Sequence, residues 1–225
     1  MKPEQNPYLP FITTDEPFFH RCRKGPNKIH PQQNHDSLRP TIFLDRDGVI
    51  IEDVKYLRDA KQIKFLPGVI EGLKELQQHF LLICITNQSA VARGYIGEPE
   101  LAIIHNQLIK DLQEQQVFMA GLYYCPHLAN GKITKYAINC DCRKPKSGML
   151  SRAITEWKVL ASKSFVIGDS HRDIESGQDH NIRGILINRG CGPLSRSLPK
   201  NTLCITTNLQ EAADIIFRTS DIRTS

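Results

Sequence analysis

The chain has 225 residues, which is enough for one domain with a sizeable core and an additional segment. Its hydrophobic content of 40%, charged content of 24% and net charge of +5 are ordinary for a soluble globular protein. The sequence has no dense basic run that would indicate a nucleic-acid groove, and no apolar stretch long enough to cross a membrane. The N-terminus lacks the apolar core of a signal peptide, so we expect a cytoplasmic location.

Residues 1–40 differ in composition from the rest. Seven of the 13 prolines lie there, and apolar periodicity is absent. We expect an extended N-terminal arm, with an arm docked along a site as the alternative that the sequence leaves open. Residues 41–225 are expected to form the folded domain.

From residue 41 onward, apolar strands alternate with helices. In chain order, the sequence predicts a strand at 41–44, a helix at 68–79, a strand at 80–85, a helix at 98–115, a strand at 121–125, an irregular loop to about 143, a helix at 147–157, a strand at 164–168, a helix at 171–180, a strand at 183–188 and a helix at 209–218. Continuously apolar strands between helices indicate an α/β fold, with a parallel sheet covered by helices on both faces. Ligands of such folds bind at the C-terminal ends of the strands.

Polar clusters follow three of these strands, and a fourth cluster precedes the helix at 147–157. They are Asp45 and Asp47; Thr86, Asn87, Gln88 and Ser89; Asp169, Ser170 and Asp173; and Arg143 with Lys144. Any one cluster alone is typical of turns or helix caps. Together they indicate a single site at one edge of the sheet.

Carboxylates that converge repel one another and lose hydration, so they require a cation. Oxygen ligands favour Mg²⁺, and the Thr86 hydroxyl with the Lys144 ammonium suits a phosphoryl group. One carboxylate can attack phosphorus to form an aspartyl-phosphate. The other can protonate the leaving oxygen and then deprotonate the attacking water. The sequence contains no GxxxxGK[ST] phosphate loop.

A second constellation lies in the irregular loop. Cys125, His127, Cys140 and Cys142 have a C-x-H, C-x-C spacing, and three thiolates with one imidazole fill a tetrahedral zinc site. We expect a structural Zn²⁺ that fixes this loop. Buried thiols or a redox-active pair are the alternatives. Because the loop ends in Arg143 and Lys144, the metal would also help to place these two residues.

The motifs "DRDG", "TN", a downstream lysine and "GDSHRD" together resemble the haloacid dehalogenase (HAD) phosphatase superfamily. The resemblance implies a three-layer, Rossmann-like sheet. It makes Asp45 the nucleophile and Asp47 the general acid/base. Thr86 and Lys144 would hold phosphate. The magnesium ligands would be Asp45, the backbone carbonyl of Asp47, and Asp169.

Longer segments, "FLDRDGVI", "TNQSAVARGYI", "YYCPH" and "CDCRKPKSGML", resemble the D-glycero-D-manno-heptose 1,7-bisphosphate 7-phosphatase family over residues 41–193. The resemblance implies a minimal cap, a phosphorylated sugar substrate, and a place in the synthesis of nucleotide-activated heptose for glycans such as lipopolysaccharide. We expect a monomer. The substrate contacts that it implies are Arg46, Asp53, Val54, Lys55, Tyr56, Asn87, Gln88, Ser89, Arg143 and Ser170.

The sequence departs from this family at three positions. The family commonly has glycine at the position of Lys55, lysine at that of Ser170, and glycine at that of Ala90. Histidinol-phosphatase, with a shorter zinc loop, is the nearest rival. A zinc-containing nucleic-acid-binding module and an inactive regulatory relative are rivals from other classes.

Overall fold

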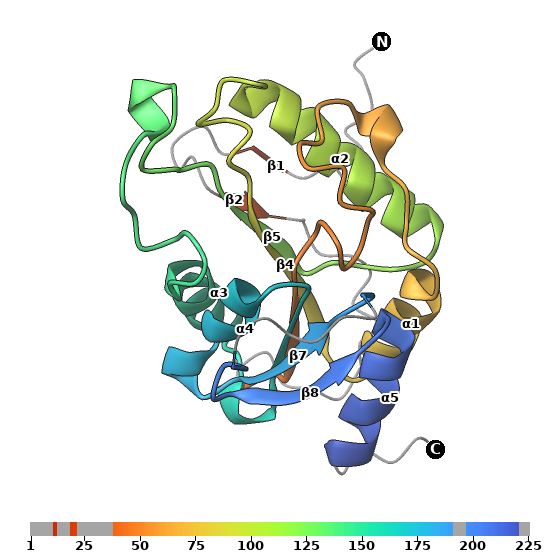
Figure 1. Ribbon diagram of the computed structural model, residues 1–225. Helices are drawn as coiled ribbons and strands as arrows, with labels where there is room; N and C mark the ends of the chain where they lie inside the picture. Colours follow the sequence, from red (N-terminus) through yellow and green to blue (C-terminus); the bar gives the residue numbers. More distant parts are fainter. Residues whose placement is uncertain (1–10, 13–18, 22–37, 191–196, 221–225) are drawn as a thin grey trace.

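The computed structural model describes residues 11–12, 19–21, 38–190 and 197–220. Eight strands form one sheet in the order β1-β2-β5-β4-β3-β6-β7-β8 (Figure 1). The six strands from β5 to β8 in this order are parallel, and β1 and β2 are antiparallel additions beyond β5. The expected parallel α/β sheet is therefore confirmed.

The parallel strands span Thr41–Leu44 (β3), Leu81–Asn87 (β4), Gly121–Cys125 (β5), Phe165–Gly168 (β6), Arg183–Ile187 (β7) and Thr202–Thr206 (β8). The helices span Val69–Leu76 (α1), Glu98–Glu114 (α2), Gly148–Trp157 (α3), His171–Glu175 (α4) and Leu209–Thr219 (α5). Single turns of 3-10 helix cover Ala60–Gln62 (η1), Thr134–Tyr136 (η2), Ala161–Lys163 (η3) and Gln178–His180 (η4).

The sheet is the middle layer of three, as the resemblance implied. Helices α1, α2 and α5 lie on one face, and α3 and α4 on the other (Figure 1). Successive strand residues point to opposite faces. Ile42 and Leu44 therefore pack toward the first group of helices, whereas Phe43 packs toward α3. This double-sided burial explains why the strands are apolar at every position rather than at alternate ones.

The order in which successive strands are added to the sheet reverses beside β3. Strands β4 and β5 follow on one side of β3, while β6 to β8 follow on the other. Ligands bind at such a switch point, at the C-terminal strand ends. Asp45 follows β3 directly and Asp169 follows β6, so the fold brings two of the expected carboxylates to this place.

Three expectations differ from the structure. The sequence pattern missed β8, which forms the edge of the sheet beside β7. The helix expected at 171–180 is α4 followed by a separate 3-10 turn, and the chain turns at Gly177. Two segments of the expected extended arm, Phe11–Ile12 (β1) and Phe19–Arg21 (β2), pair with the sheet at β5. The rest of residues 1–37 lies outside the described part of the chain.

No helix in the described ranges combines the length and the apolar character that crossing a membrane requires.

Candidate active site and metal cluster

Lys144 is the centre of the charged site. Its Nζ lies 2.9 Å from Asp45 Oδ1 and 2.7 Å from Asp173 Oδ1, and it donates to the backbone oxygen of Ile85 at 2.8 Å. The residue is only 2% exposed. Burial acts to lower the pKa of Lys144, but Asp173 and Asp45 raise it above its usual value, so the ammonium stays charged. Burial raises the pKa of Asp45, and Lys144 opposes this shift.

Asp169 completes a group of three carboxylates. Oxygen atoms of Asp45, Asp169 and Asp173 all lie within 4.8 Å of one another. Asp169 keeps contact with solvent, but the protein atoms packed around its carboxylate, and then Asp173, raise its pKa to about 6. Lys144 pairs with two of these three carboxylates, and a hard divalent cation would relieve the remaining repulsion. These residues therefore fit Mg²⁺.

Gly48 is required next to this group. Its φ of 77° lies in the left-handed region, and a Cβ there would collide with the Asp169 carboxylate. The turn after β3 is closed by backbone hydrogen bonds from Gly48 and Ile51, including Gly48 N to Ile51 O at 2.8 Å. The glycine lets Asp45 and Asp169 approach from neighbouring strands.

Asp47 is held by side chains rather than lying free at the site. Arg46 donates from Nη2 to both of its oxygens, at 2.9 and 2.8 Å, and Gln88 Nε2 donates to Oδ2 at 2.9 Å. Gln88 also donates to Thr86 Oγ1 at 2.8 Å and accepts from Arg46 at 2.9 Å. Arg46 and Gln88 are 1% and 4% exposed. Their buried side chains support Asp47, and Gln88 also supports Thr86; that they contact substrate stays a prediction.

Two further expected contacts also bind protein groups. The Asn87 amide pairs with the backbone of Lys144 in both directions, each at 3.1 Å. Ser170 Oγ donates to Asp173 Oδ2 at 2.6 Å at the start of α4. Asn87 therefore holds the lysine backbone, and Ser170 orients Asp173.

The loop at residues 53–56 forms an exposed rim. Lys55 has a φ of 65°, and its backbone N–H donates to Asp53 Oδ1 at 2.7 Å. Asp53, Val54 and Lys55 are exposed, and Tyr56 is half-buried. The rings of Tyr56 and Tyr95 meet edge to face at 4.8 Å. This contact connects the rim to the chain segment that follows Ser89. The Ser89 side chain itself is half-buried.

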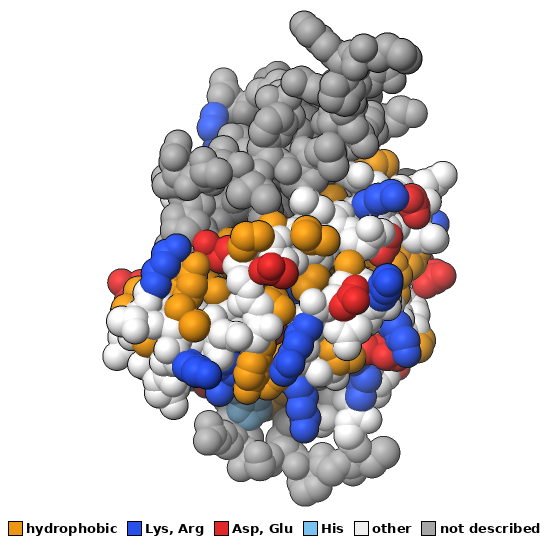
Figure 2. Space-filling model, turned by 90° about the horizontal axis from the view of Figure 1, so that it is seen from above, with side chains coloured by type: hydrophobic (Ala, Val, Ile, Leu, Met, Phe, Trp, Pro, Cys, Tyr) orange, Lys and Arg blue, Asp and Glu red, His pale blue; other side chains and the backbone are white. Residues whose placement is uncertain are grey.

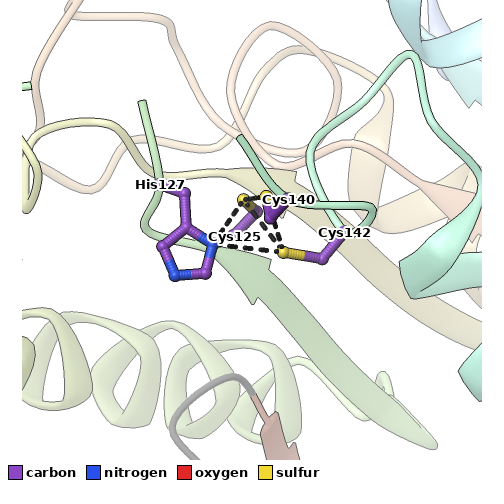
Figure 3. Close-up of side chains that lie close together, drawn as sticks. All are labelled: Cys125, His127, Cys140 and Cys142. Atoms are coloured by element: carbon purple, nitrogen blue, oxygen red, sulfur yellow. Dashed lines mark hydrogen bonds between the residues drawn. The ribbon is translucent and has the colours of Figure 1, made fainter. Parts of the chain in front are cut away.

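The four expected zinc ligands converge (Figure 3). The sulfurs of Cys125, Cys140 and Cys142 lie 3.2 to 3.5 Å apart, and His127 Nδ1 lies 3.4 Å from Cys142 Sγ. A tetrahedral site with Zn–S bonds of about 2.3 Å places its sulfur ligands roughly 3.8 Å apart, so slight expansion admits the ion. Burial and then Arg143 lower the pKa of His127, which keeps the imidazole neutral as a metal requires. The donor set fits Zn²⁺.

Arg143 connects the two sites. Its Nη1 donates to the backbone oxygen of His127 at 2.9 Å, and the next residue is the central Lys144. Zinc bound at this cluster would therefore also fix the backbone that carries both basic residues.

Asp173 received no role in the sequence analysis, although it stood in the "GDSHRD" cluster. Its Oδ2 accepts from the backbone N–H of Ser170 at 3.0 Å, and Oδ1 contacts Lys144. Burial acts to raise the pKa of Asp173, but Lys144 holds it below its usual value. The signal that could have found it is the spacing of one helical turn from Asp169.

Comparisons with known proteins agree with this geometry. A protein-family model described as HAD-hydrolase-like matches residues 141–212. D-glycero-beta-D-manno-heptose-1,7-bisphosphate 7-phosphatase from Haemophilus influenzae is 40% identical over 155 residues, which are 68% of this chain and 84% of the relative. The protein of the same name from Pasteurella multocida is 34% identical, over 80% of this chain and 97% of the relative. The chain belongs to this family of phosphatases.

A solved structure supports the same assignment. D,D-heptose 1,7-bisphosphate phosphatase from B. bronchiseptica, complexed with magnesium and phosphate, has a TM-score of 0.68 and 25% identity, covering 80% of this chain and 98% of that one. As a member of this HAD-type family, the chain is a phosphoric monoester hydrolase.

Proposed function

We propose that the protein hydrolyses the C7 phosphate of D-glycero-β-D-manno-heptose 1,7-bisphosphate through an aspartyl-phosphate on Asp45. The observation that carries this proposal is the convergence of Asp45, Asp169 and Asp173 around Lys144 at the switch point of the sheet. The names of relatives at 34% and 40% identity supply the substrate and its anomer.

The chemistry uses two carboxylates in sequence. An oxygen of Asp45 attacks phosphorus while the bond from phosphorus to O7 breaks, and Asp47 gives its proton to O7 so that the sugar leaves as an alcohol. Water then attacks the phosphorus of the aspartyl-phosphate and Asp47 takes a proton from it. This step releases inorganic phosphate and restores the Asp45 carboxylate.

The other site residues bind the phosphoryl group and orient it. Lys144 stabilises negative charge beside Asp45, and Thr86 presents its hydroxyl at the end of β4. Mg²⁺, held by Asp45, Asp169 and the backbone carbonyl of Asp47, would neutralise charge on the phosphoryl oxygens. Zn²⁺ at the Cys125 cluster would serve structure alone, because four protein ligands leave no open position.

The rim supports recognition of the rest of the sugar bisphosphate. Lys55 is exposed on the loop beside Asp53, and Arg143 is half-buried next to Lys144. Both are cations that suit a second phosphate. On the face shown in Figure 2, basic side chains are interspersed with acidic and apolar ones, which suits a small anionic substrate better than a nucleic-acid backbone.

The proposal also covers the cellular compartment and the domain organisation of the chain. The five cysteines in the described ranges are free, which supports a reducing compartment such as the cytoplasm. Residues 41–225 are proposed as the catalytic domain and residues 1–40 as an appended segment. A monomer stays a prediction, to be measured by light scattering.

The test is phosphate release, with Mg²⁺, from both anomers of heptose 1,7-bisphosphate and from histidinol phosphate. We expect the protein to prefer the β-anomer strongly. We expect the Asp45→Asn variant to form no phosphorylated protein and to show no turnover, while its thermal stability stays unchanged. Preference for histidinol phosphate would replace the substrate while keeping the chemistry. Full activity of Asp45→Asn would overturn the assignment of the nucleophile.

A further inference from the structure

His105 lies inside the protein on the helix that covers β4 and β5, outside every motif quoted for the site. It is 1% exposed and lies on the same face of α2 as the buried Leu101, Ile104 and Leu108. The ring of Tyr124 on β5 stands 5.4 Å away between centroids. A histidine at a core-facing helix position loses hydration and needs a polar partner.

That partner is Arg46. Nη1 of Arg46 lies 3.0 Å from His105 Nε2, and both side chains are buried. A guanidinium ion carries only donors, so the imidazole nitrogen must accept. His105 is therefore a neutral imidazole whose Nε2 is unprotonated. A charged imidazolium could not make this contact.

The guanidinium of Arg46 also hydrogen-bonds Asp47, the proposed general acid/base. Nε and Nη2 of Arg46 donate to Asp47, and Nη2 also donates to Gln88. With Nη1 on His105, each of the three guanidinium nitrogens has a side-chain partner, which restricts rotation of the planar group. His105 thus lies one side chain away from Asp47.

We propose that His105 is a positioning residue that locks Arg46, and through it Asp47, in the orientation used for proton transfer to the leaving oxygen. The role rests on the proposed function, because it acts on the group assigned as general acid. Without His105, Nη1 would be a buried donor with no acceptor, a costly state that the guanidinium can escape only by moving. Asp47 would then lose two of its three donors.

The chemistry of the acceptor explains why a histidine suits this position. A carboxylate at residue 105 would compete with Asp47 for the charge of Arg46 and draw the guanidinium toward α2. A neutral acceptor orients the group without neutralising it. Glutamine can also place a neutral oxygen near the position of Nε2, which provides a conservative variant.

The experiment compares His105→Leu and His105→Gln on two substrates, the sugar bisphosphate and p-nitrophenyl phosphate, using kcat/KM. This ratio reports the steps up to departure of the leaving group. The alcohol needs a proton from Asp47, whereas p-nitrophenolate leaves as a stable anion. We expect His105→Leu to lose about tenfold to a hundredfold on the sugar and less than about threefold on the aryl ester, because general-acid catalysis matters for the first alone.

His105→Gln is expected to restore the sugar activity to within about threefold of the unaltered protein, since it keeps an acceptor for Arg46. Leu108→Ala, on the same buried helix face, is the control: it lowers thermal stability and leaves the ratio of the two activities unchanged. Equal losses of His105→Leu on both substrates would overturn the positioning role while the proposed function stands. An unaltered protein that releases phosphate from neither substrate would overturn both.

Discussion

Asp45, Asp169 and Asp173 define the site at the scale of single residues, because three carboxylates gather around one buried ammonium group. Lys144 neutralises the two that it contacts, and its effect on their pKa values is opposed by burial in each case. Asp169 lies in the same group, and burial, followed by the charge of Asp173, raises its pKa to about 6. The site is therefore built for a further cation.

The pH dependence of magnesium binding follows from these shifts. The pKa of Asp169 is raised to about 6 from an ordinary value of 3.8, so its contribution to stability is present below about pH 4 and is lost as the pH rises through about 6. Asp45 shifts in the same direction. Mg²⁺ binds the ionised carboxylates, and should therefore stabilise the protein more at pH 8 than at pH 5.

At a concentration of about 100 times Kd, we expect Mg²⁺ to raise Tm by roughly 5–10 °C at pH 8, and by much less at pH 5. The measurement is thermal unfolding of the zinc-loaded protein with and without added Mg²⁺. Asp169→Asn is the control that should lose most of the shift. An equal increase in Tm at both pH values would show that these carboxylates do not hold the ion.

Gly48 offers a test of close approach. Gly48→Ala adds strain at a φ of 77° and forces a Cβ into the Asp169 carboxylate, so we expect kcat/KM to fall by more than about tenfold together with about 1–2 kcal/mol of stability. Gly68→Ala is matched for strain, with a φ of 74°, but its Cβ would lie 3.6 Å from the nearest atom. It should lose stability and keep activity, as steady-state kinetics and thermal unfolding can establish. Normal activity in Gly48→Ala would count against this packing.

Sequence position alone identified the residues that follow strands, since strand ends converge at one edge of a parallel sheet. Asp45 and Asp169 follow β3 and β6 directly, as expected, whereas Thr86 lies within β4 next to its last residue, and the catalytic roles of all three stay predictions. Side-chain direction could not be read from the sequence, and the inward turn of Arg46 and Gln88 was missed for that reason. Lys55 has a positive φ that L residues rarely adopt, so the glycine that the resemblance implies at this position would take the same conformation without strain.

At the scale of elements, the loop that carries Cys140 and Cys142 continues directly into Lys144, the proposed catalytic lysine. Cys140→Ser is expected to reduce bound zinc well below one per chain and to lower Tm by on the order of 10 °C, since a structural zinc supplies several kcal/mol. Activity should fall as well, because Arg143 is bonded to the His127 backbone and Lys144 follows it. Zinc analysis, thermal unfolding and phosphate release measure the three effects.

Cys204→Ser is the matched control for this change, because Cys204 lies on β8 outside the cluster and is also partly buried. It should keep zinc and activity. A Cys140→Ser protein with full zinc content would remove Cys140 from the ligand set, and one without zinc but with unchanged Tm would remove the structural role.

The elements that the sequence misplaced are short ones. Strand β8 has five residues, and Leu203 and Ile205 are exposed while their neighbours are more buried. An edge strand of this kind lacks the continuous apolar run that marked the inner strands. Helix α4 ends before Gly177, where the chain turns and a Cβ would fit only tightly beside Val166 and Ile182. Local composition near residue 177 predicted a continuing helix. In the structure the helix ends earlier, where the chain packs against the sheet.

At the scale of the whole molecule, the proposed catalytic groups and the two buried clusters come from residue 41 onward. Of the two described strands of the N-terminal segment, β2 pairs with the outer edge of β5 and β1 pairs with β2. An uncovered edge strand presents unpaired N–H and C=O groups that can pair with another chain. The segment would thus protect the sheet without taking part in catalysis.

Removal of residues 1–37 tests this division of the chain. We expect kcat/KM within about threefold of the full chain, because the site keeps all of its charged groups, and a concentration-dependent shift to larger species, because the edge of β5 is open. Phosphate release and light scattering across a protein dilution series measure the two outcomes. A full-length variant with Phe19→Pro, which disturbs β2 at its pairing with Tyr123, should show the same association at equal length. A loss of activity with unchanged secondary structure would instead make the segment part of the site.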